Sequence, residues 1–285
     1  MTNEAYITKQ YYSEKPLKTD VLCLSVVISP SSFVYSISTN NFKNVIELCH
    51  VELTHVANSV FDITDKVSFL INNYLLQQRK FEKVNICFLN NEFTMVPEAF
   101  ALDTDMKSYL KFSSGKEQVK RSLQHHLKNL NFCFTLEQEL INYFERTFPN
   151  VSIRHLGAVS IDLFFSQHSL KSNNLYLNIG DGYIELAAKQ KTELLFYNVF
   201  NYENNEDILY YLLFTMEQFD LNPLYVRLSL AGQRNLPDDL IINIKKYIKQ
   251  VEFCVTDPSV NLNGELSKLP QHYYFTLLNQ HLCEL

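Results

Sequence analysis

The chain has 285 residues, a formal net charge of −6 and a charged fraction of 20%. This length predicts two domains or one large one, and a hydrophobic fraction of 46% excludes a largely disordered chain. The acidic balance argues against a general nucleic-acid binder, because such proteins neutralise phosphates with Lys and Arg.

The N-terminus and the cysteines indicate a compartment. The first twelve residues are polar, and no apolar run approaches the roughly 20 residues of a membrane helix, so we expect neither a signal peptide nor a membrane span. The six cysteines are irregularly spaced without a CxxC pair, which argues against a zinc cluster. Most lie in apolar runs, where a free Cys behaves as a small hydrophobe. This pattern is typical of a reducing cytoplasm, and we expect a cytoplasmic protein.

The first half of the chain combines strand and helix patterns. Apolar runs and period-two alternation predict strands, whereas apolar residues spaced by three and four predict helices. The expected order is strands at 21–28, 33–38 and 45–52, a helix at 56–78, a strand at 84–89, a helix at 137–148, a strand at 151–155 and a helix at 158–167.

An insertion interrupts this order. Residues 90–134 are too long for a bare loop, so they predict a small inserted subdomain. Within it we expect strands at 93–96 and 132–134 and a helix at 116–129.

The second half repeats the first. Asn204 or Asn205 is expected to cap the first helix of this half, and Pro237 to open the second. The expected order is strands at 175–179, 183–188 and 193–199, a helix at 207–219, a strand at 224–230, a helix at 237–249, a strand at 251–255 and a final helix at 273–282.

An antiparallel meander followed by strand–helix–strand crossovers predicts a mixed sheet with helices on both faces. Because the order occurs twice, we predict a duplicated α/β fold of two lobes, each with a mixed five-stranded sheet flanked by helices. The expected domains are 1–170, with the subdomain at about 90–134, and 171–285 with the C-terminal helix.

This duplicated order resembles the actin-like ATPase (ribonuclease H-like) fold shared by actin, Hsp70 and the sugar kinases. Short segments add to the likeness: Asn91 to Pro97, Arg154 to Gly157, and the end at Cys283–Glu284. Over nearly its whole length the chain resembles a Bacteroidetes family of unknown function, domain of unknown function 3822. The resemblance implies a nucleotide cleft between two halves, in which hairpin turns cradle phosphates and carboxylates organise Mg²⁺.

The second-half hairpin resembles one phosphate loop. Gly180, Asp181 and Gly182 match its pattern, but Asn178 stands where an acidic residue is expected and the bulky Tyr183 follows the turn. Asp-Gly is also a leading signal of a simple hairpin turn. Both interpretations stay open.

The first-half hairpin departs further. Ile28 stands where Asp is expected, and Pro30, between Ser29 and Ser31, removes a backbone donor. The adenosine loop keeps only Gly232 of an expected glycine pair. The resemblance therefore implies a degenerate nucleotide cleft formed by Ser29, Ser31, Asn178, Gly180, Asp181, Gly182 and Gly232, with no catalytic residue.

Three further motifs predict no site. Gly115–Lys116 lacks the flanking residues of a phosphate-binding P-loop. His50 and Glu52 share a strand face, but His55 falls beyond it, which argues against a metal site. His125 and His126 are expected on different faces of a helix.

Two functions follow as hypotheses. The first is a non-catalytic scaffold or partner-binding module whose insertion contacts an unknown protein. The alternative is a nucleotide-binding protein with weak ATPase or small-molecule kinase activity, which requires ATP and Mg²⁺. A third interpretation, a regulatory subunit at the inner membrane face, finds no basic amphipathic anchor in the sequence. We expect no resident cofactor, and the sequence does not indicate the oligomeric state.

Overall fold

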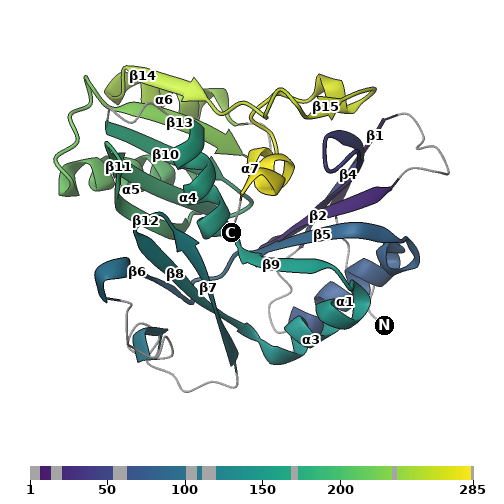
Figure 1. Ribbon diagram of the computed structural model, residues 1–285. Coiled ribbons are helices and arrows are strands. Elements are labelled where there is room, and N and C mark those ends of the chain that lie inside the picture. The colour runs from purple at the N-terminus through teal and green to yellow at the C-terminus, as the bar shows by residue number, and fades with distance from the viewer. Residues whose placement is uncertain are drawn as a thin grey trace. The chain divides into compact units, whose positions relative to one another are not determined.

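A computed structural model describes residues 7–13, 21–53, 63–100, 108–110, 120–167, 173–232 and 236–283 (Figure 1). The chain forms two compact units. The first comprises Met1–Val159, Val260–Ser267 and Cys283–Leu285, and the second comprises Ser160–Ser259 and Lys268–Leu282. The domains predicted from the sequence, 1–170 and 171–285, stay a prediction.

The first unit is built on a seven-stranded mixed sheet. Its order is β1-β4-β3-β2-β5-β9, with β15 beside β4. The neighbours from β1 to β2 are antiparallel, whereas β2, β5 and β9 are parallel. The strands are β1 (Ile7–Tyr12), β2 (Leu22–Ile28), β3 (Ser32–Thr39), β4 (Asn44–Glu52), β5 (Phe81–Phe88), β9 (Val151–His155) and β15 (Asn261–Leu262).

Two helices pack side by side on one face of this sheet (Figure 1). They are α1 (Ile63–Asn73), followed by the 3₁₀ turn η1 (Leu76–Gln78), and α3 (Gln138–Thr147). Their apolar residues recur at helical spacing, so each presents one buried stripe. Phe144 of α3 contacts Phe88 of β5 edge to face at 5.7 Å. The predicted helix at 56–78 is confirmed over residues 63–73, and residues 56–62 lie outside the described residues. The helix ends earlier than predicted, because Leu75 adopts a φ of 54° before η1.

The predicted insertion contains a three-stranded antiparallel sheet of order β6-β8-β7. Its strands are β6 (Phe93–Pro97), followed by the turn η2 (Glu98–Phe100), β7 (Lys120–Leu127) and β8 (Leu130–Glu137). The helix predicted at 116–129 is wrong in its described part, because 120–127 form β7. Leu127 pairs with Leu130 across a two-residue turn, in which Lys128 adopts a φ of 51°.

The second unit contains a five-stranded sheet of order β12-β11-β10-β13-β14. This matches the order β4-β3-β2-β5-β9 of the first unit, with the same alternation of antiparallel and parallel neighbours. Both units therefore contain the predicted five-stranded arrangement, which β1 and β15 extend in the first. The strands are β10 (Asn173–Ile179), β11 (Tyr183–Gln190), β12 (Glu193–Asn201), β13 (Arg227–Gly232) and β14 (Gln250–Phe253).

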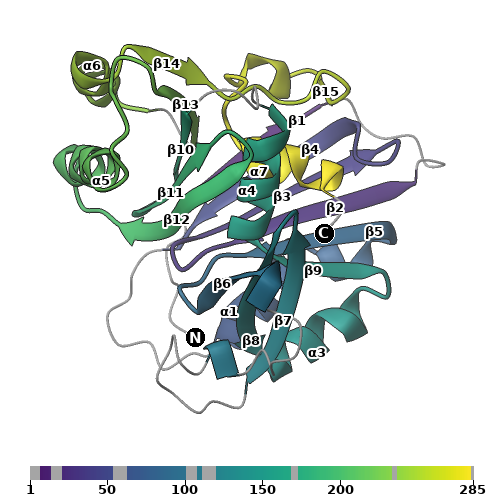
Figure 2. The same ribbon diagram turned by 60° about the vertical axis from the view of Figure 1, so that its left-hand side comes forward.

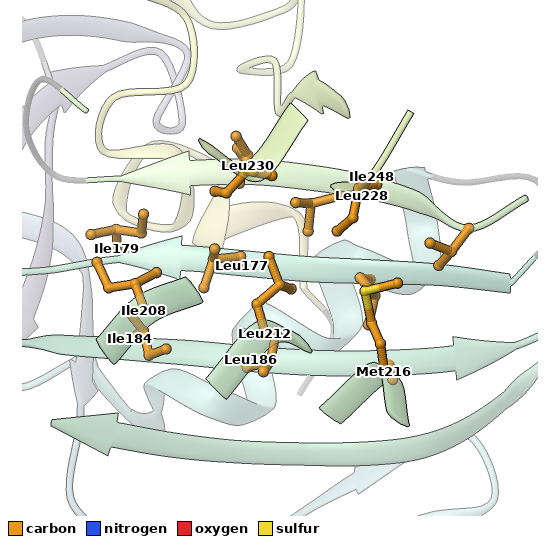
Figure 3. Close-up of a cluster of buried hydrophobic side chains, with 14 of the residues drawn as sticks. Leu177, Ile179, Ile184, Leu186, Ile208, Leu212, Met216, Leu228, Leu230 and Ile248 are labelled. Carbon is orange, nitrogen blue, oxygen red and sulfur yellow. The ribbon is translucent and has the colours of Figure 1, made fainter. Parts of the chain in front are cut away.

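Helices cover both faces of the second sheet (Figure 2). On one face α5 (Asn205–Gln218) and α6 (Asp238–Tyr247) bury a leucine- and isoleucine-rich core, in which Leu177 and Leu186 face Leu212 (Figure 3). On the other face lie α4 (Leu156–Gln167), and α7 (Phe275–Asn279) with the turn η4 (Gln280–Leu282). A further short turn, η3 (Leu266–Lys268), precedes α7 in the chain.

The predicted helix ends agree with the structure at α5. The Asn204 side chain accepts a bond from the Asp207 N–H at 3.0 Å, and the Asp207 side chain bonds back to the Asn204 backbone. This capping box confirms Asn204 as the N-cap. Pro237 is the residue that precedes α6. Among the described residues, no helix is both long and apolar enough to cross a bilayer.

Candidate functional site

The hairpin between β2 and β3 holds Ser29 and Ser31. The Ser29 N–H donates to the Ser32 carbonyl at 2.9 Å, which closes a four-residue turn around Pro30. Ser29 Oγ then accepts the N–H groups of Ser31, at 3.3 Å, and Ser32, at 2.9 Å. Because Pro30 has no N–H, both backbone donors that follow it point at a side chain of the same turn.

The hairpin between β10 and β11 holds Gly180, Asp181 and Gly182. It closes through the Gly180 N–H, which donates to the Tyr183 carbonyl at 2.9 Å, and Gly182 has a φ of +74°, which favours glycine. The Tyr183 ring lies so close over Gly180 that a Cβ there would overlap it. The space beside the Gly180 backbone, through which a ligand could approach a glycine, is therefore occupied by the Tyr183 ring of the same hairpin.

Tyr183 is itself a buried polar side chain. It is 3% exposed, and its hydroxyl finds no hydrogen-bond partner among the described residues. Burial raises the pKa of this hydroxyl well above its usual value, and the carboxylates of Glu185 and Asp181 raise it further. The phenol is therefore neutral at physiological pH.

Asn178 bonds to a carboxylate on the next strand. Asn178 Nδ2 donates to Glu185 Oε2 at 2.6 Å, and the hydroxyl of Tyr197 donates to Glu185 Oε1 at 2.8 Å. Glu185 is the register partner of Asn178 and is fully buried. Burial raises the pKa of Glu185, and the bonds from Asn178, Tyr197 and Ser160 oppose this rise. An acidic group is therefore present beside Asn178, one strand away from the position that the resemblance implies.

Gly232 ends β13 beside the same hairpin. It is in register with Ile179 at the end of β10. The structure therefore brings Asn178, Gly180 and Gly232 together where the strands β10 and β13 end. The Gly232 N–H donates to the His272 carbonyl at 3.2 Å, and the Gly232 carbonyl accepts from the Tyr274 N–H at 2.9 Å. Both backbone groups of this glycine are thus bonded to the segment before α7.

His155, in the segment Arg154 to Gly157, joins β9 to the small sheet of the insertion. Its Nδ1 accepts the Gly157 N–H at 3.0 Å, so its Nε2 carries the proton and lies 3.1 Å from the Asn90 carbonyl. The ring packs against the rings of Phe132 at 4.8 Å and Phe134 at 5.3 Å. His155 therefore caps the start of α4 and anchors the insertion to β9.

A second histidine extends this cluster. His125 Nε2 lies 3.4 Å from the His155 N–H, which donates to it, and the His125 ring stacks on Phe134 at 5.2 Å. Burial lowers the pKa of His155 to about 3 and that of His125 to about 4, with Arg154 adding to the second shift. Both rings are neutral at physiological pH. His126 is exposed, because adjacent residues of a strand face opposite sides.

Two residues of the remaining sequence motifs, His50 and Glu52, lie in β4. His50 is fully buried in β4, and Glu52 forms an ion pair with Lys9 at 3.1 Å. His55 and residues 113–117 lie outside the described residues. All six cysteines are buried, which agrees with their prediction as small apolar residues.

The chain matches a family described as a protein of unknown function, DUF3822, over residues 13–251. The chain belongs to the DUF3822 family. This confirms the resemblance that the sequence motifs indicate. No curated protein matches the chain by sequence.

Two solved structures show the fold of this DUF3822 protein. A Bacteroides thetaiotaomicron protein of unknown function with an actin-like ATPase fold is similar at a TM-score of 0.70 and 22% identity, over 86% of this chain and 94% of that one. The PilM–PilN type IV pilus biogenesis complex is similar at a TM-score of 0.62 and 10% identity, over 91% of this chain and 97% of the other. The predicted actin-like ATPase fold is confirmed.

Sequence reasoning missed three residues that shape these hairpins: Ser32, Glu185 and Tyr197. A signal existed for Glu185, since a lone acidic residue in the apolar run Tyr183 to Ala188 needs a partner when the strand is buried on both faces. Its partners could not be identified, because they come from neighbouring strands whose register the sequence does not give.

Proposed function

We propose that this DUF3822 protein is a non-catalytic, actin-like scaffold that binds a protein partner. The observation that carries the proposal is the internal use of the first hairpin, where Ser29 Oγ accepts the N–H groups of Ser31 and Ser32. A phosphate cradle needs such N–H groups directed at the ligand. At the second hairpin, the Tyr183 ring occupies the approach to Gly180.

Calorimetry and a thermal shift with millimolar Mg-ATP test this proposal. A ligand present at 100 times its Kd stabilises a protein by about 2.7 kcal/mol, so binding at useful affinity is easily measured. We expect no heat and no shift. ATP turnover that disappears in Asp181→Ala but persists in the surface carboxylate variant Glu217→Ala contradicts the proposal.

A weak nucleotide-binding activity is the second candidate. It is favoured by the placement of Gly180 directly after β10 and of Gly232 at the end of the neighbouring strand β13, with the Glu185 carboxylate beside Asn178. Tyr183→Ser removes the ring that covers Gly180. If this variant binds Mg-ATP and the wild type does not, the fold retains a nucleotide site that its own side chain closes.

The insertion is the proposed partner surface. One structural relative is a complex of PilM with PilN, so a protein of this fold does bind another protein. On the insertion, Phe100 is 69% exposed, and Arg121, Gln124 and His126 are exposed on β7. These residues offer an aromatic anchor and a polar edge, which is a common composition of partner surfaces.

Surface substitutions test the insertion without unfolding it. Removal of residues 90–134 would also remove Phe132 and Phe134, which pack on His155. We therefore choose Phe100→Ser with Arg121→Glu, and Tyr247→Ser on α6 as the control. We expect quantitative pull-downs from cells of the source organism to lose a partner only with the double variant. If all three proteins retain the same partners, the insertion is not the partner surface.

A further inference from the structure

The edge strand β12 of the second unit has few of the features that protect an exposed edge. It is nine residues long and the last strand of its sheet, and among the described residues it pairs only with β11 (Figure 2). Glu193 is its only charged residue, and it contains no Lys and no Pro. The Val199 N–H donates to the side chain of its neighbour, Asn198 Oδ1, at 2.9 Å. Long apolar edges of this kind are templates for an added strand.

The first unit shows what such an edge can bind. Its strand β4 holds the position that β12 holds in the second sheet, and β1 pairs with β4 along six residues, from Ile7 opposite Glu52 to Tyr12 opposite Glu47. Within this pair, Lys9 Nζ lies 3.1 Å from Glu52 Oε1. The covering strand is therefore antiparallel, carries a cation for an acidic residue of the edge, and contains tyrosines.

An aromatic band runs from β12 across the outer side of α5. The rings of Phe200 and Tyr211 stack at 4.2 Å, Tyr211 contacts Tyr210 at 5.4 Å, and Tyr210 stacks on Phe214 at 5.8 Å. Tyr210 is 59% exposed and Phe214 45% exposed. Exposed aromatic side chains held by stacking lose little conformational entropy on binding, which makes them effective anchors.

The charge around this band has one sign. Residues 192–226 contain no Lys and no Arg, and their acidic residues are Glu193, Glu203, Glu206, Asp207, Glu217 and Asp220. Antiparallel pairing of two β12 strands would bring two such acidic surfaces together, which is unfavourable. The charge therefore selects a basic partner over a second copy of this chain.

We propose that β12 and the aromatic band of α5 bind an extended, Lys- and Arg-rich segment of a partner protein, which adds to the sheet as an antiparallel strand. Main-chain bonds to β12 provide affinity, as in other cases of strand addition. Apolar side chains of the segment pack on Tyr210 and Phe214, while its cations pair with the acidic residues beside the band. This proposal uses residues outside the insertion and does not depend on whether nucleotide binds.

A fluorescent decapeptide of alternating Lys and Val is the probe. The same peptide with Glu in place of Lys is the charge control. Anisotropy titrations compare the wild type with the double variant Tyr210→Ser, Phe214→Ser, and with Tyr247→Ser as the matched aromatic control on α6. We expect the wild type to bind the Lys peptide and not the Glu peptide. The double variant should bind the Lys peptide with a Kd higher by about tenfold or more. Binding should weaken as salt rises from about 0.05 to 0.5 M.

Hydrogen exchange distinguishes strand addition from adsorption to an acidic surface. With the Lys peptide bound, amides of β12 become protected, whereas amides of β14 at the opposite edge do not change. Equal binding of the Glu peptide, unchanged binding by the double variant, or binding without protection of β12 overturns the proposal. Sedimentation of the protein alone is the last check, because a dimer that the double variant dissociates assigns this edge to a second copy instead.

Discussion

The first and second units share one strand order, yet they differ in the side chains that surround their first hairpins and in the pKa shifts of their buried groups. Around the first hairpin the side chains are small, and Ser29 alone satisfies the turn. Around the second, the Tyr183 ring fills the turn and a carboxylate, Glu185, lies fully buried behind it. The duplicated fold therefore fixes the backbone path, whereas the content of each hairpin is free to diverge.

The units also differ in how pH acts on them. Among the buried groups of the first unit, His155 and His125 are bases with lowered pKa values. In the second unit, Glu185 is a buried acid with a raised pKa. Linkage then predicts that acidification acts in opposite directions through these groups: it destabilises the first unit through the two histidines and stabilises the second through Glu185. Hydrogen exchange read separately for each unit is the suitable measurement, because a two-unit chain need not unfold in one step.

The largest expected effect is the loss of stability of the first unit in acid. The pKa values of about 3 for His155 and about 4 for His125 lie below the unfolded value of 6.5, so the unfolded state binds more protons as pH falls below 6.5. We expect a loss of about 4 kcal/mol between pH 7 and pH 5, summed over the two rings. His125→Gln should remove about half of it, whereas His126→Gln at the exposed neighbour should not. An equal pH response in all three proteins contradicts the assignment.

The next effect is steric and confined to the second unit. Gly180→Ala places a methyl group where the Tyr183 ring lies, which we expect to cost about 3 kcal/mol by overpacking. Urea denaturation with exchange detection measures this loss. Adding Tyr183→Ser should restore part of the stability, because the ring that clashes is gone. A double variant no more stable than Gly180→Ala would show that backbone conformation, and not the ring, demands the glycine.

A smaller effect concerns the buried carboxylate. Because the folded pKa of Glu185 is raised, its protonated form stabilises the second unit at low pH, and this contribution disappears as pH rises above 4.5. Glu185→Gln should flatten the pH dependence of the second unit and leave that of the first unit unchanged. The bond to Tyr197 remains possible in this variant, since the amide oxygen still accepts. A pH slope that persists in the second unit assigns the titration to another group.

The smallest effect belongs to the first hairpin. Ser29→Ala removes the acceptor of the Ser31 and Ser32 N–H groups, and we expect a loss of about 1 kcal/mol. Ser31→Ala is the control, because the two backbone N–H groups keep their acceptor at Ser29. Denaturation of both variants under one condition measures the difference. A larger loss in Ser31→Ala would mean that Ser29 Oγ does not hold the turn.

Much of the fold could be predicted, and the reason is periodicity. Strands such as β2 and β11 are largely apolar runs, and α5 combines a helical stripe with a capping box at Asn204. The sequence predicts a helix where β7 lies, because most residues of β7 are polar and show no clear alternation of apolar and polar residues. The alternation becomes recognisable only when His125 and Leu127 are seen to be buried. β1 and β15 carry weak signals, because edge strands are short or polar.

The candidate residues were predictable only as positions in the chain. The turn at Gly180 to Gly182 follows from Asp-Gly, a local signal. The contact of Asn178 with Glu185 depends on strand register, and the ring of Tyr183 over Gly180 depends on a rotamer. Neither can be derived from spacing along the sequence, so what the hairpins hold became apparent only in three dimensions.

The two-residue strand β15 links the first sheet to a late part of the chain. Asn261 Nδ2 donates to Asn44 Oδ1 at 2.7 Å across a separation of 217 residues. During synthesis, residues 160–259 of the second unit emerge from the ribosome before β15 does. The strand β15 can therefore pair with β4 only after most of the second unit has been synthesised. Because closing so long a loop is slow, we expect the pairing of β15 with β4 to be a late step in the folding of the first sheet.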